Sequence, residues 1–152
     1  MTTLFLLIFT ISTLSAEHID NKTFFSTVYR HKGWNNPETL SGDGSTLKRT
    51  MVIRQSLPKL FEKLKITTVL DAGCGDFNWM RTIDLTSLNF YIGMDIVDQV
   101  IQDNKKKFET ERRRFALADV LHEKLPAVDL IMCRDCIQHL SDTDVKAFIN
   151  RV

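Results

Sequence analysis

The stretch Val69 to Met80, VLDAGCGDFNWM, decides the fold. Its apolar start ends in Asp71 and then breaks into Gly73 and Gly75, which predicts a buried strand over residues 67–71 followed by a tight turn. Glycine is used where the chain needs a positive φ or where a ligand approaches the backbone closely. Open α/β sheets bind their ligands at the carboxyl ends of their strands. The stretch therefore predicts a binding loop, and a plain turn is the alternative.

Length and composition are those of one ordinary globular domain. The chain has 152 residues, of which 43% are hydrophobic and 26% are charged. The formal net charge of +1 gives no overall field that would attract nucleic acid or a membrane surface. Partners must therefore be predicted from local patterns.

The first 16 residues have the outline of a secretory signal peptide, because an apolar run over residues 4–14 is followed by small side chains. The run is too short for a stable membrane span, and a buried N-terminal helix or strand is the alternative. Three cysteines, an odd number, fit a reduced compartment better than a disulfide framework. The pattern of residues 1–16 favours secretion and the cysteine usage favours the cytoplasm, so the sequence leaves the localisation open.

Residues 17–66 are predicted to form an N-terminal helical region. Asp20 is placed to cap a short helix, and a loop over residues 31–45 follows, with Trp34 as its large apolar anchor. Apolar spacing then predicts helix over residues 46–64, which Pro58 divides into two helices. The SGDGS sequence in the loop predicts either a linker or a helix N-terminus that could meet an anion.

Strands and helices alternate in the rest of the chain. Apolar runs predict four strands, over residues 67–71, 90–97, 114–118 and 128–133, with helices between and after them. Strands that are apolar without alternation are covered on both faces. The fold class is therefore α/β, a Rossmann-like doubly wound and mostly parallel sheet of four strands with an N-terminal helical cap.

Three acids, Asp71, Asp95 and Asp119, follow successive predicted strands. An acid about 20 residues past a glycine turn, at the end of the second strand, is placed to accept the hydroxyls of a ribose, and Asp95 has this position. The pattern therefore indicates a nucleoside ligand. A dinucleotide fingerprint requires glycine or alanine where this chain has Asn78, which argues against a nicotinamide cofactor.

The DAGCGD sequence resembles motif I of the class I S-adenosylmethionine-dependent methyltransferases. YIGMDIV resembles their second motif, FALADV their adenine-contacting segment, and DLIMCRDCIQHLS their fourth motif with the helix after it. More narrowly, SGDGSTLKRT, IRQSLP and CGDFNWM are similar to a bacterial-type methyltransferase-domain family. The resemblance runs from residue 34 to the end. It implies that residues 67–152 are a partial cofactor-binding domain without the C-terminal part, because the family's sheet has seven strands.

The resemblance also implies roles for individual residues around S-adenosyl-L-methionine. One group would surround the methionine part, a second would hold the ribose and adenine, and a third would line the floor near the sulfonium. These groups are, in that order, Asp71, Gly73 and Gly75; Asp95, Ile96, Asp119 and Val120; Cys133 and Arg134. A third glycine common in motif I is replaced by Phe77.

Catalysis by a sulfonium methyl donor mainly requires that the acceptor is held in line and dry, with a base only where the acceptor arrives protonated. His139 and Asp135 are the candidates for that base, and a packed helix residue is the alternative for His139. Cys133 and Cys136 form a CxxC pair that could indicate redox chemistry or half a metal site. Its flanking residues resemble neither a thioredoxin turn nor a zinc knuckle, so no metal is predicted.

The sequence thus predicts methyl transfer from S-adenosyl-L-methionine to a small-molecule acceptor. The D/N-P-P-Y signature of enzymes that methylate base amino groups is absent, so no nucleic-acid partner is predicted. The alternative is a truncated, non-catalytic cofactor-binding or interaction module. Such a module could form a homodimer through the bare edge of its sheet.

Overall fold

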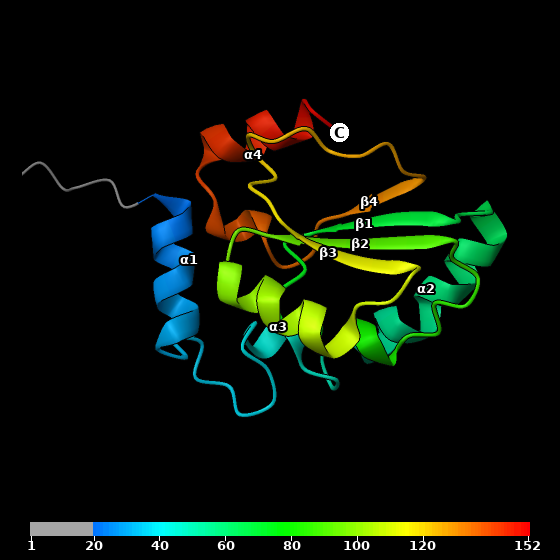
Figure 1. Cartoon of the computed structure of the whole chain (residues 1–152), viewed down its shortest axis with the longest axis horizontal. Helices are drawn as coiled ribbons and strands as arrows, with labels where there is room; N and C mark the ends of the chain where they lie inside the picture. The colour runs from blue at the N-terminus through cyan, green and yellow to red at the C-terminus, as the bar shows by residue number, and fades with distance from the viewer. Residues whose placement is uncertain (1–19) are drawn as a thin grey trace, which may run out of the picture.

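The computed structural model describes residues 20–152, so the predicted signal peptide lies outside the described residues. The described residues form four strands and four α-helices, together with three short 3-10 helices (Figure 1). In chain order the elements are α1 (Asn21–Arg30), η1 (Asp43–Ser45), α2 (Met51–Leu64), β1 (Thr68–Ala72), η2 (Met80–Thr82), β2 (Phe90–Asp95), α3 (Asp98–Phe108), β3 (Arg113–Leu117), β4 (Leu130–Met132), η3 (Ile137–His139) and α4 (Asp142–Ile149).

The four strands form one parallel sheet in the order β3-β2-β1-β4. Val69 in β1 pairs with Tyr91 in β2 on one side and with Leu130 in β4 on the other. The strand order reverses between β1 and β4, because β2 and β3 lie on one side of β1 and β4 lies on the other. Open α/β sheets bind ligands at such a switch point.

Helices cover both faces of the sheet, which confirms the predicted Rossmann-like α/β class. In Figure 1, α2 and α3 lie below the sheet and α4 lies above it. The core below the sheet includes Val69, Phe77 and Phe115, and a smaller core above it is formed around Ala72, Leu121 and Phe148. Burial on both sides explains why the strands are apolar without strict alternation.

Side-chain capping begins the first and last helices. Asp20 accepts a hydrogen bond from the backbone of Thr23, and Ser141 accepts one from the backbone of Asp144. Both are the acceptors that helix N-termini prefer. The capping of α1 by Asp20 was predicted from the sequence.

The predicted break at Pro58 is wrong, because α2 is one helix with Pro58 inside it. Proline removes one backbone hydrogen bond and costs roughly 3 kcal/mol in a helix interior. Leu57 and Phe61, on either side of Pro58, are buried in the core. Burying two such side chains stabilises the helix by a comparable amount, so packing offsets the cost.

Asp129 joins β4 to β1 at the amino ends of the strands. Its carboxylate accepts hydrogen bonds from the backbone of Thr67 and Thr68 and from the Thr67 hydroxyl, at 2.8 to 2.9 Å. These hydrogen bonds lower the pKa of Asp129 to about 2. The short β4 strand is thereby held in register against β1.

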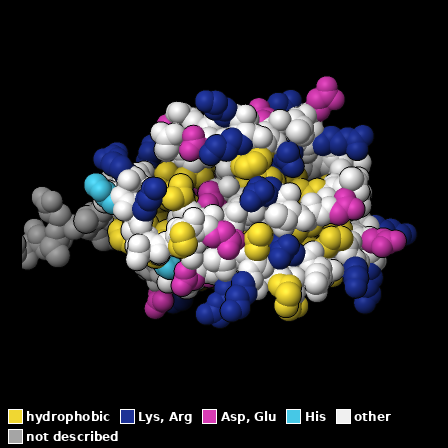
Figure 2. Space-filling model, turned by 90° about the horizontal axis from the view of Figure 1, so that it is seen from below, with side chains coloured by type: hydrophobic (Ala, Val, Ile, Leu, Met, Phe, Trp, Pro, Cys, Tyr) yellow, Lys and Arg dark blue, Asp and Glu magenta, His cyan; other side chains and the backbone are white. Residues whose placement is uncertain are grey.

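Basic side chains are dispersed over the surface. Figure 2 shows Lys and Arg interspersed with Asp and Glu on one face of the molecule. Lys107 pairs with Asp103, and Arg114 pairs with Glu109. Within residues 20–152, none of the helices has the length and the apolar run that crossing a bilayer would require.

Candidate active site

The turn after β1 is tight and depends on two glycines. The backbone amides of Gly73 and Cys74 both donate to the Met94 carbonyl of β2, at 2.8 and 2.9 Å. Gly73 has φ +78° and Gly75 has φ +55°, which glycine adopts without strain. A Cβ atom at Gly75 would lie 2.2 Å from the Ser41 hydroxyl oxygen. The glycines are therefore required by backbone shape and by the close approach of other segments of the chain.

Asp95, at the end of β2, is buried beside this turn and is 8% exposed. One of its carboxylate oxygens accepts from the Gly75 backbone at 2.9 Å, and the other accepts from the Val97 backbone at 3.0 Å. Burial raises the pKa of Asp95, while these backbone hydrogen bonds act in the opposite direction. Each oxygen keeps a second lone pair, and Asp95 lines the cavity described below.

Asp71 lies deeper in the same region and is 4% exposed. The Tyr91 hydroxyl donates to its carboxylate at 2.7 Å. Burial raises the pKa of Asp71 to about 7, with a further contribution from the nearby Asp95, while the Tyr91 hydrogen bond and Arg134 oppose the shift. Asp71 therefore changes charge near neutral pH.

Asp119, after β3, is more exposed than the other two acids. It accepts from the Leu121 backbone at 2.9 Å and contacts the His122 ring nitrogen at 2.7 Å. The hydrogen bond and charge of Asp119 raise the pKa of His122. Both carboxylate oxygens already have a partner, so an adenine amino group would use a remaining lone pair or displace His122.

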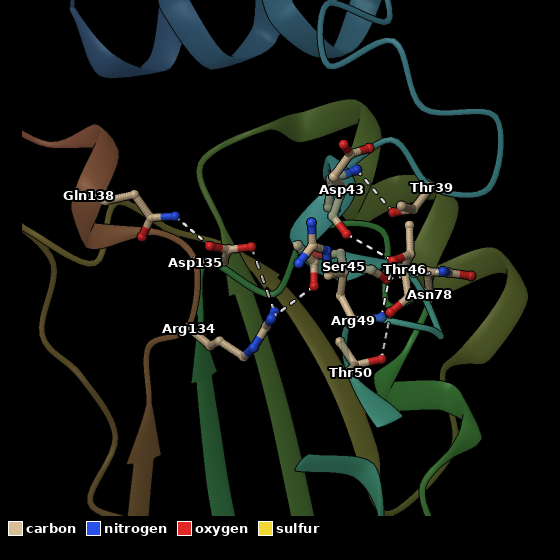
Figure 3. A network of polar contacts seen from close by, with 12 residues as sticks. Thr39, Asp43, Ser45, Thr46, Arg49, Thr50, Asn78, Arg134, Asp135 and Gln138 are labelled. Carbon is tan, nitrogen blue, oxygen red and sulfur yellow. Dashed lines mark hydrogen bonds and ion pairs between the residues drawn. The ribbon is translucent and has the colours of Figure 1, made fainter. Parts of the chain in front are cut away.

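The segment after β4 carries Arg134 and Asp135 toward the loop that contains Gly44 and Ser45 (Figure 3). Arg134 donates to the Gly44 carbonyl at 2.8 Å, and its guanidinium lies over the Trp79 ring at 5.3 Å. The other terminal nitrogen of Arg134 is buried, 3.8 Å from the Asp135 carboxylate, and has no hydrogen-bond partner among the described residues. This nitrogen could bind an anionic group.

His139 packs between aromatic rings at the cavity wall. Its ring centroid lies 5.0 Å from that of Trp34 and 6.3 Å from that of Phe25. Asp135 has a left-handed backbone with φ +57°, and its carboxylate accepts from the Gln138 side chain. His139 and Asp135 both line the cavity.

One cavity brings most of the predicted site residues together. Asp71, Gly73, Gly75, Asp95, Ile96, Asp119, Val120, Arg134, Asp135 and His139 line it. Cys133 does not; it packs against the smaller core above the sheet, and Cys136 takes its place in the cavity wall. Within residues 20–152, no group of three or more His, Cys, Asp or Glu side chains is placed to hold a metal ion.

The N-terminal segment supplies lining residues that sequence reasoning missed, among them Phe25, Tyr29 and Ser41. Ser41 shares a hydrogen bond with Tyr29 at 2.7 Å and accepts from the Asp76 backbone at 3.0 Å. The Asp76 carboxylate in turn accepts from the Leu40 backbone at 2.7 Å and from the Thr39 hydroxyl. Residues 39–41 therefore form a strap that is fastened to the glycine turn.

The SGDGS sequence is neither a free linker nor the start of a long helix. Gly42 has φ +83° and leads into the three-residue helix η1. A Cβ atom at Gly44 would lie 1.5 Å from the Asp135 carboxylate. The segment is therefore packed against the turn after β4.

Phe77 stands where motif I commonly has a third glycine. It adopts φ +59°, the left-handed backbone that glycine would favour. Its ring is 1% exposed and lies within 5.1 to 5.3 Å of the rings of Tyr91, Phe108 and Phe115. Aromatic packing holds a backbone conformation that costs roughly 1–2 kcal/mol in an ordinary residue.

The residues of the cavity fit S-adenosyl-L-methionine. Asp95 offers two buried carboxylate oxygens that could accept the hydroxyls of a ribose, and Arg134 offers a buried guanidinium nitrogen without a hydrogen-bond partner among the described residues. The cofactor carries two positive groups, a sulfonium and an ammonium, and one negative group, a carboxylate. The acids of the cavity can match the positive groups, and Arg134 can match the carboxylate. A parallel sheet with this strand order, a glycine turn after β1 and acids after the next two strands are all features of the class I S-adenosylmethionine-dependent methyltransferases.

The family model described as "Methyltransferase domain" matches residues 69–152. The chain therefore belongs to the methyltransferase-domain family, whose methyl donor is S-adenosyl-L-methionine. No curated protein matches the chain.

Solved structures of methyltransferases share the fold. Magnesium protoporphyrin IX methyltransferase from Synechocystis PCC 6803, with bound S-adenosylmethionine, is 19% identical with a TM-score of 0.61, over 89% of this chain and 71% of that one. A Leishmania major S-adenosylmethionine-dependent methyltransferase is 20% identical with a TM-score of 0.64, over 87% and 56%. The methyltransferase domain of bacterial CtHen1 is 17% identical with a TM-score of 0.58, over 70% and 60%. The chain thus spans little more than half of the length of two of these three proteins.

Proposed function

We propose that the chain binds S-adenosyl-L-methionine and transfers its methyl group to a small-molecule acceptor. The observation that carries this proposal is that one cavity is lined by acids from the ends of three successive strands and by the glycines of the turn after β1. The methionine sulfonium of the cofactor supplies an activated methyl group. The chain's own residues then need to bind, orient and exclude water.

The proposed contacts to the cofactor follow from the polar groups in the cavity. Asp95 accepts hydrogen bonds from the ribose hydroxyls with its unshared lone pairs, and Ile96 lies beside the adenine. Asp119 accepts from the adenine amino group, next to Val120. Arg134, through the nitrogen that lacks a partner, binds the carboxylate of the methionine part.

Asp71 and the glycine turn surround the rest of the methionine part. The carboxylate of Asp71 faces a cationic ligand, and Gly73 and Gly75 let the backbone come close to it. Buried carboxylates stabilise a positive charge more strongly than exposed ones, because the local dielectric is low.

The acceptor is proposed to enter on the side formed by Phe25, Trp34 and His139. These rings form a largely apolar wall that suits a small organic molecule and excludes water. His139 takes a proton from an acceptor that arrives protonated, and Asp135 is the second candidate for this role. His139 has two functions in this proposal, because its ring is also part of the packed wall.

The proposal is tested by titration calorimetry with S-adenosyl-L-methionine, and by formation of S-adenosylhomocysteine in a screen of small acceptors. Asp95→Ala should abolish binding, and Asp103→Ala, an exposed acid of α3, should leave it unchanged. Circular dichroism reports whether each variant is folded. Unchanged affinity in a folded Asp95→Ala variant would contradict the ribose assignment.

One observation favours a second candidate, a module that binds the cofactor without turnover. Among the described residues, β4 is the outer strand on its side of the sheet, and its three residues are only partly buried. Such an edge can pair with a second copy of the chain. Binding without any S-adenosylhomocysteine product, together with a dimer in sedimentation experiments, would favour this candidate over the enzyme.

A further inference from the structure

Two thiols lie together in the turn after β4. Cys133 and Cys136 are both half-buried and are not joined by a disulfide. The left-handed backbone of Asp135 turns the chain between them. The interaction between the two thiols lowers the pKa of Cys133 and raises that of Cys136, and burial also raises the pKa of Cys136.

Cys136 also touches the glycine turn of the cofactor site. A Cβ atom at Gly73 would lie 2.8 Å from the Cys136 sulfur and 3.0 Å from its Cβ, so the thiol packs directly against the turn. Arg134 and Asp135, which contact Gly44 from the other side, lie between the two cysteines in the chain. A bond between the two sulfurs would therefore pull on both walls of the cavity.

We propose that Cys133 and Cys136 are a redox-active dithiol, and that their oxidation to a disulfide weakens the binding of S-adenosyl-L-methionine. The first half of this proposal concerns the cysteines alone. The second half rests on the proposed function of the cavity.

The oxidant is a small disulfide, for which glutathione disulfide is the probe. The Cys133 thiolate attacks one sulfur of the probe, a mixed disulfide forms, and one glutathione leaves as its thiolate. Cys136 loses its proton to solvent and attacks the Cys133 sulfur, and the second glutathione leaves. Two cysteine thiols are thereby oxidised, and one glutathione disulfide is reduced to two thiols.

Cys133 has the attacking role in this proposal, because its interaction with Cys136 lowers its pKa and a thiolate is the nucleophile. Cys74 is excluded from this chemistry, since its side chain is buried and burial raises the pKa of its thiol. The three cysteines of the chain are therefore predicted to divide into one reactive pair and one inert residue.

Oxidation should weaken cofactor binding through two movements. The Cys136 sulfur leaves its contact with Gly73 to bond with Cys133, which changes the wall beside the methionine part. The loop that holds Arg134 must tighten as well, and this moves its guanidinium away from the Gly44 carbonyl. We expect the dissociation constant of S-adenosyl-L-methionine to rise at least tenfold in the oxidised protein.

The test equilibrates the whole chain in buffers of reduced and oxidised glutathione, maps disulfides by mass spectrometry of peptides, and measures cofactor binding by calorimetry. The expected result is a Cys133–Cys136 disulfide in the oxidised protein, reversed by a reductant together with the affinity. Cys133→Ser, which lacks the attacking thiol, should bind the cofactor in the same way in both buffers, and Cys74→Ala should still form the Cys133–Cys136 disulfide.

The possible outcomes of this test distinguish the formation of the disulfide from its effect on cofactor binding. If no Cys133–Cys136 disulfide forms in the most oxidising buffer, the dithiol is refuted. If it forms and the affinity is unchanged, the effect on the cofactor is refuted. If the reduced protein does not bind the cofactor at all, the proposed function fails together with the second half, and the peptide masses alone decide the first.

Discussion

Asp71, in the stretch that decides the fold, gives the sharpest test of how the site is built. Burial raises the pKa of its carboxyl from 3.8 to about 7, with a contribution from Asp95. The perturbation is Asp71→Asn, which removes the titrating group. The amide oxygen of the variant can still accept a hydrogen bond from the Tyr91 hydroxyl, so the local hydrogen bond is kept.

The direction in which pH changes the stability depends on the protonation of Asp71 in the folded and in the unfolded chain. Below about pH 4, Asp71 is protonated in both states, and its contribution to stability is fully present. Between pH 4 and 7 the unfolded chain loses the proton while the folded chain keeps it, so rising pH destabilises the fold. The pKa difference of about 3 units corresponds to about 4 kcal/mol, at 1.36 kcal/mol per unit.

The assay is urea unfolding at several pH values between 4 and 8.5. We expect the stability of Asp71→Asn relative to the wild type to rise by up to about 4 kcal/mol across this range, with no further change above pH 8. Asp103→Asn, an exposed acid of α3, is the matched control and should follow the wild type. If the free energy difference between Asp71→Asn and the wild type changes by less than about 1 kcal/mol over the range, the assignment of a protonated Asp71 is wrong.

Two further predictions test the packing around the site, and a third tests the link between β4 and β1 at the other end of the sheet. Phe77→Ala should lower the free energy of unfolding by about 3–5 kcal/mol in urea unfolding. Phe77→Gly should be about 1 kcal/mol more stable than Phe77→Ala, because glycine tolerates φ +59°. A glycine variant that is less stable than the alanine variant would contradict the strain argument. Gly44→Ala should weaken S-adenosyl-L-methionine binding about tenfold (about 1.4 kcal/mol) in calorimetry, since the new Cβ overlaps the Asp135 carboxylate. Gly33→Ala is the control and should bind normally, because a Cβ atom at Gly33 meets only ordinary van der Waals contacts. Equal affinities of the two variants would show that the Gly44 contact is irrelevant to binding. Asp129→Asn should remove a loss of stability that the wild type shows as pH falls from about 4 through about 2, and acid unfolding curves that coincide would refute the role of Asp129.

The fold could be predicted from the sequence because its signals are local. Apolar runs, Asp20 and the glycine turn each act within a few residues, and the four strands lie within a few residues of their predicted bounds. The prediction at Pro58 failed because the burial of Leu57 and Phe61 overrides a local preference. Tertiary packing of this kind leaves no mark on the pattern around the proline.

The candidate site was predicted only in part, for a related reason. Asp95 and Gly75 could be found because the 20 residues that separate them are filled by one connection, which contains η2, and by the strand β2. The contact of Ser41 with Asp76 spans 35 residues and joins a loop to a loop. Serine and aspartate at that separation carry no periodicity, so only the folded structure reveals the strap.

The strap bears on how acceptor choice is encoded. The family model begins at residue 69, but Phe25, Trp34 and Ser41 line the same cavity from outside the matched span. The groups that fit the cofactor are carboxylates and backbone at strand ends, which the fold itself places. The aromatic wall, by contrast, depends on side chains of residues 21–45 that no strand positions. If that wall receives the acceptor, replacing residues 21–45 by those of a relative should change which acceptor is methylated and leave the affinity for S-adenosyl-L-methionine within a few-fold. A chimaera that keeps the original acceptor would place specificity in residues 134–140 instead.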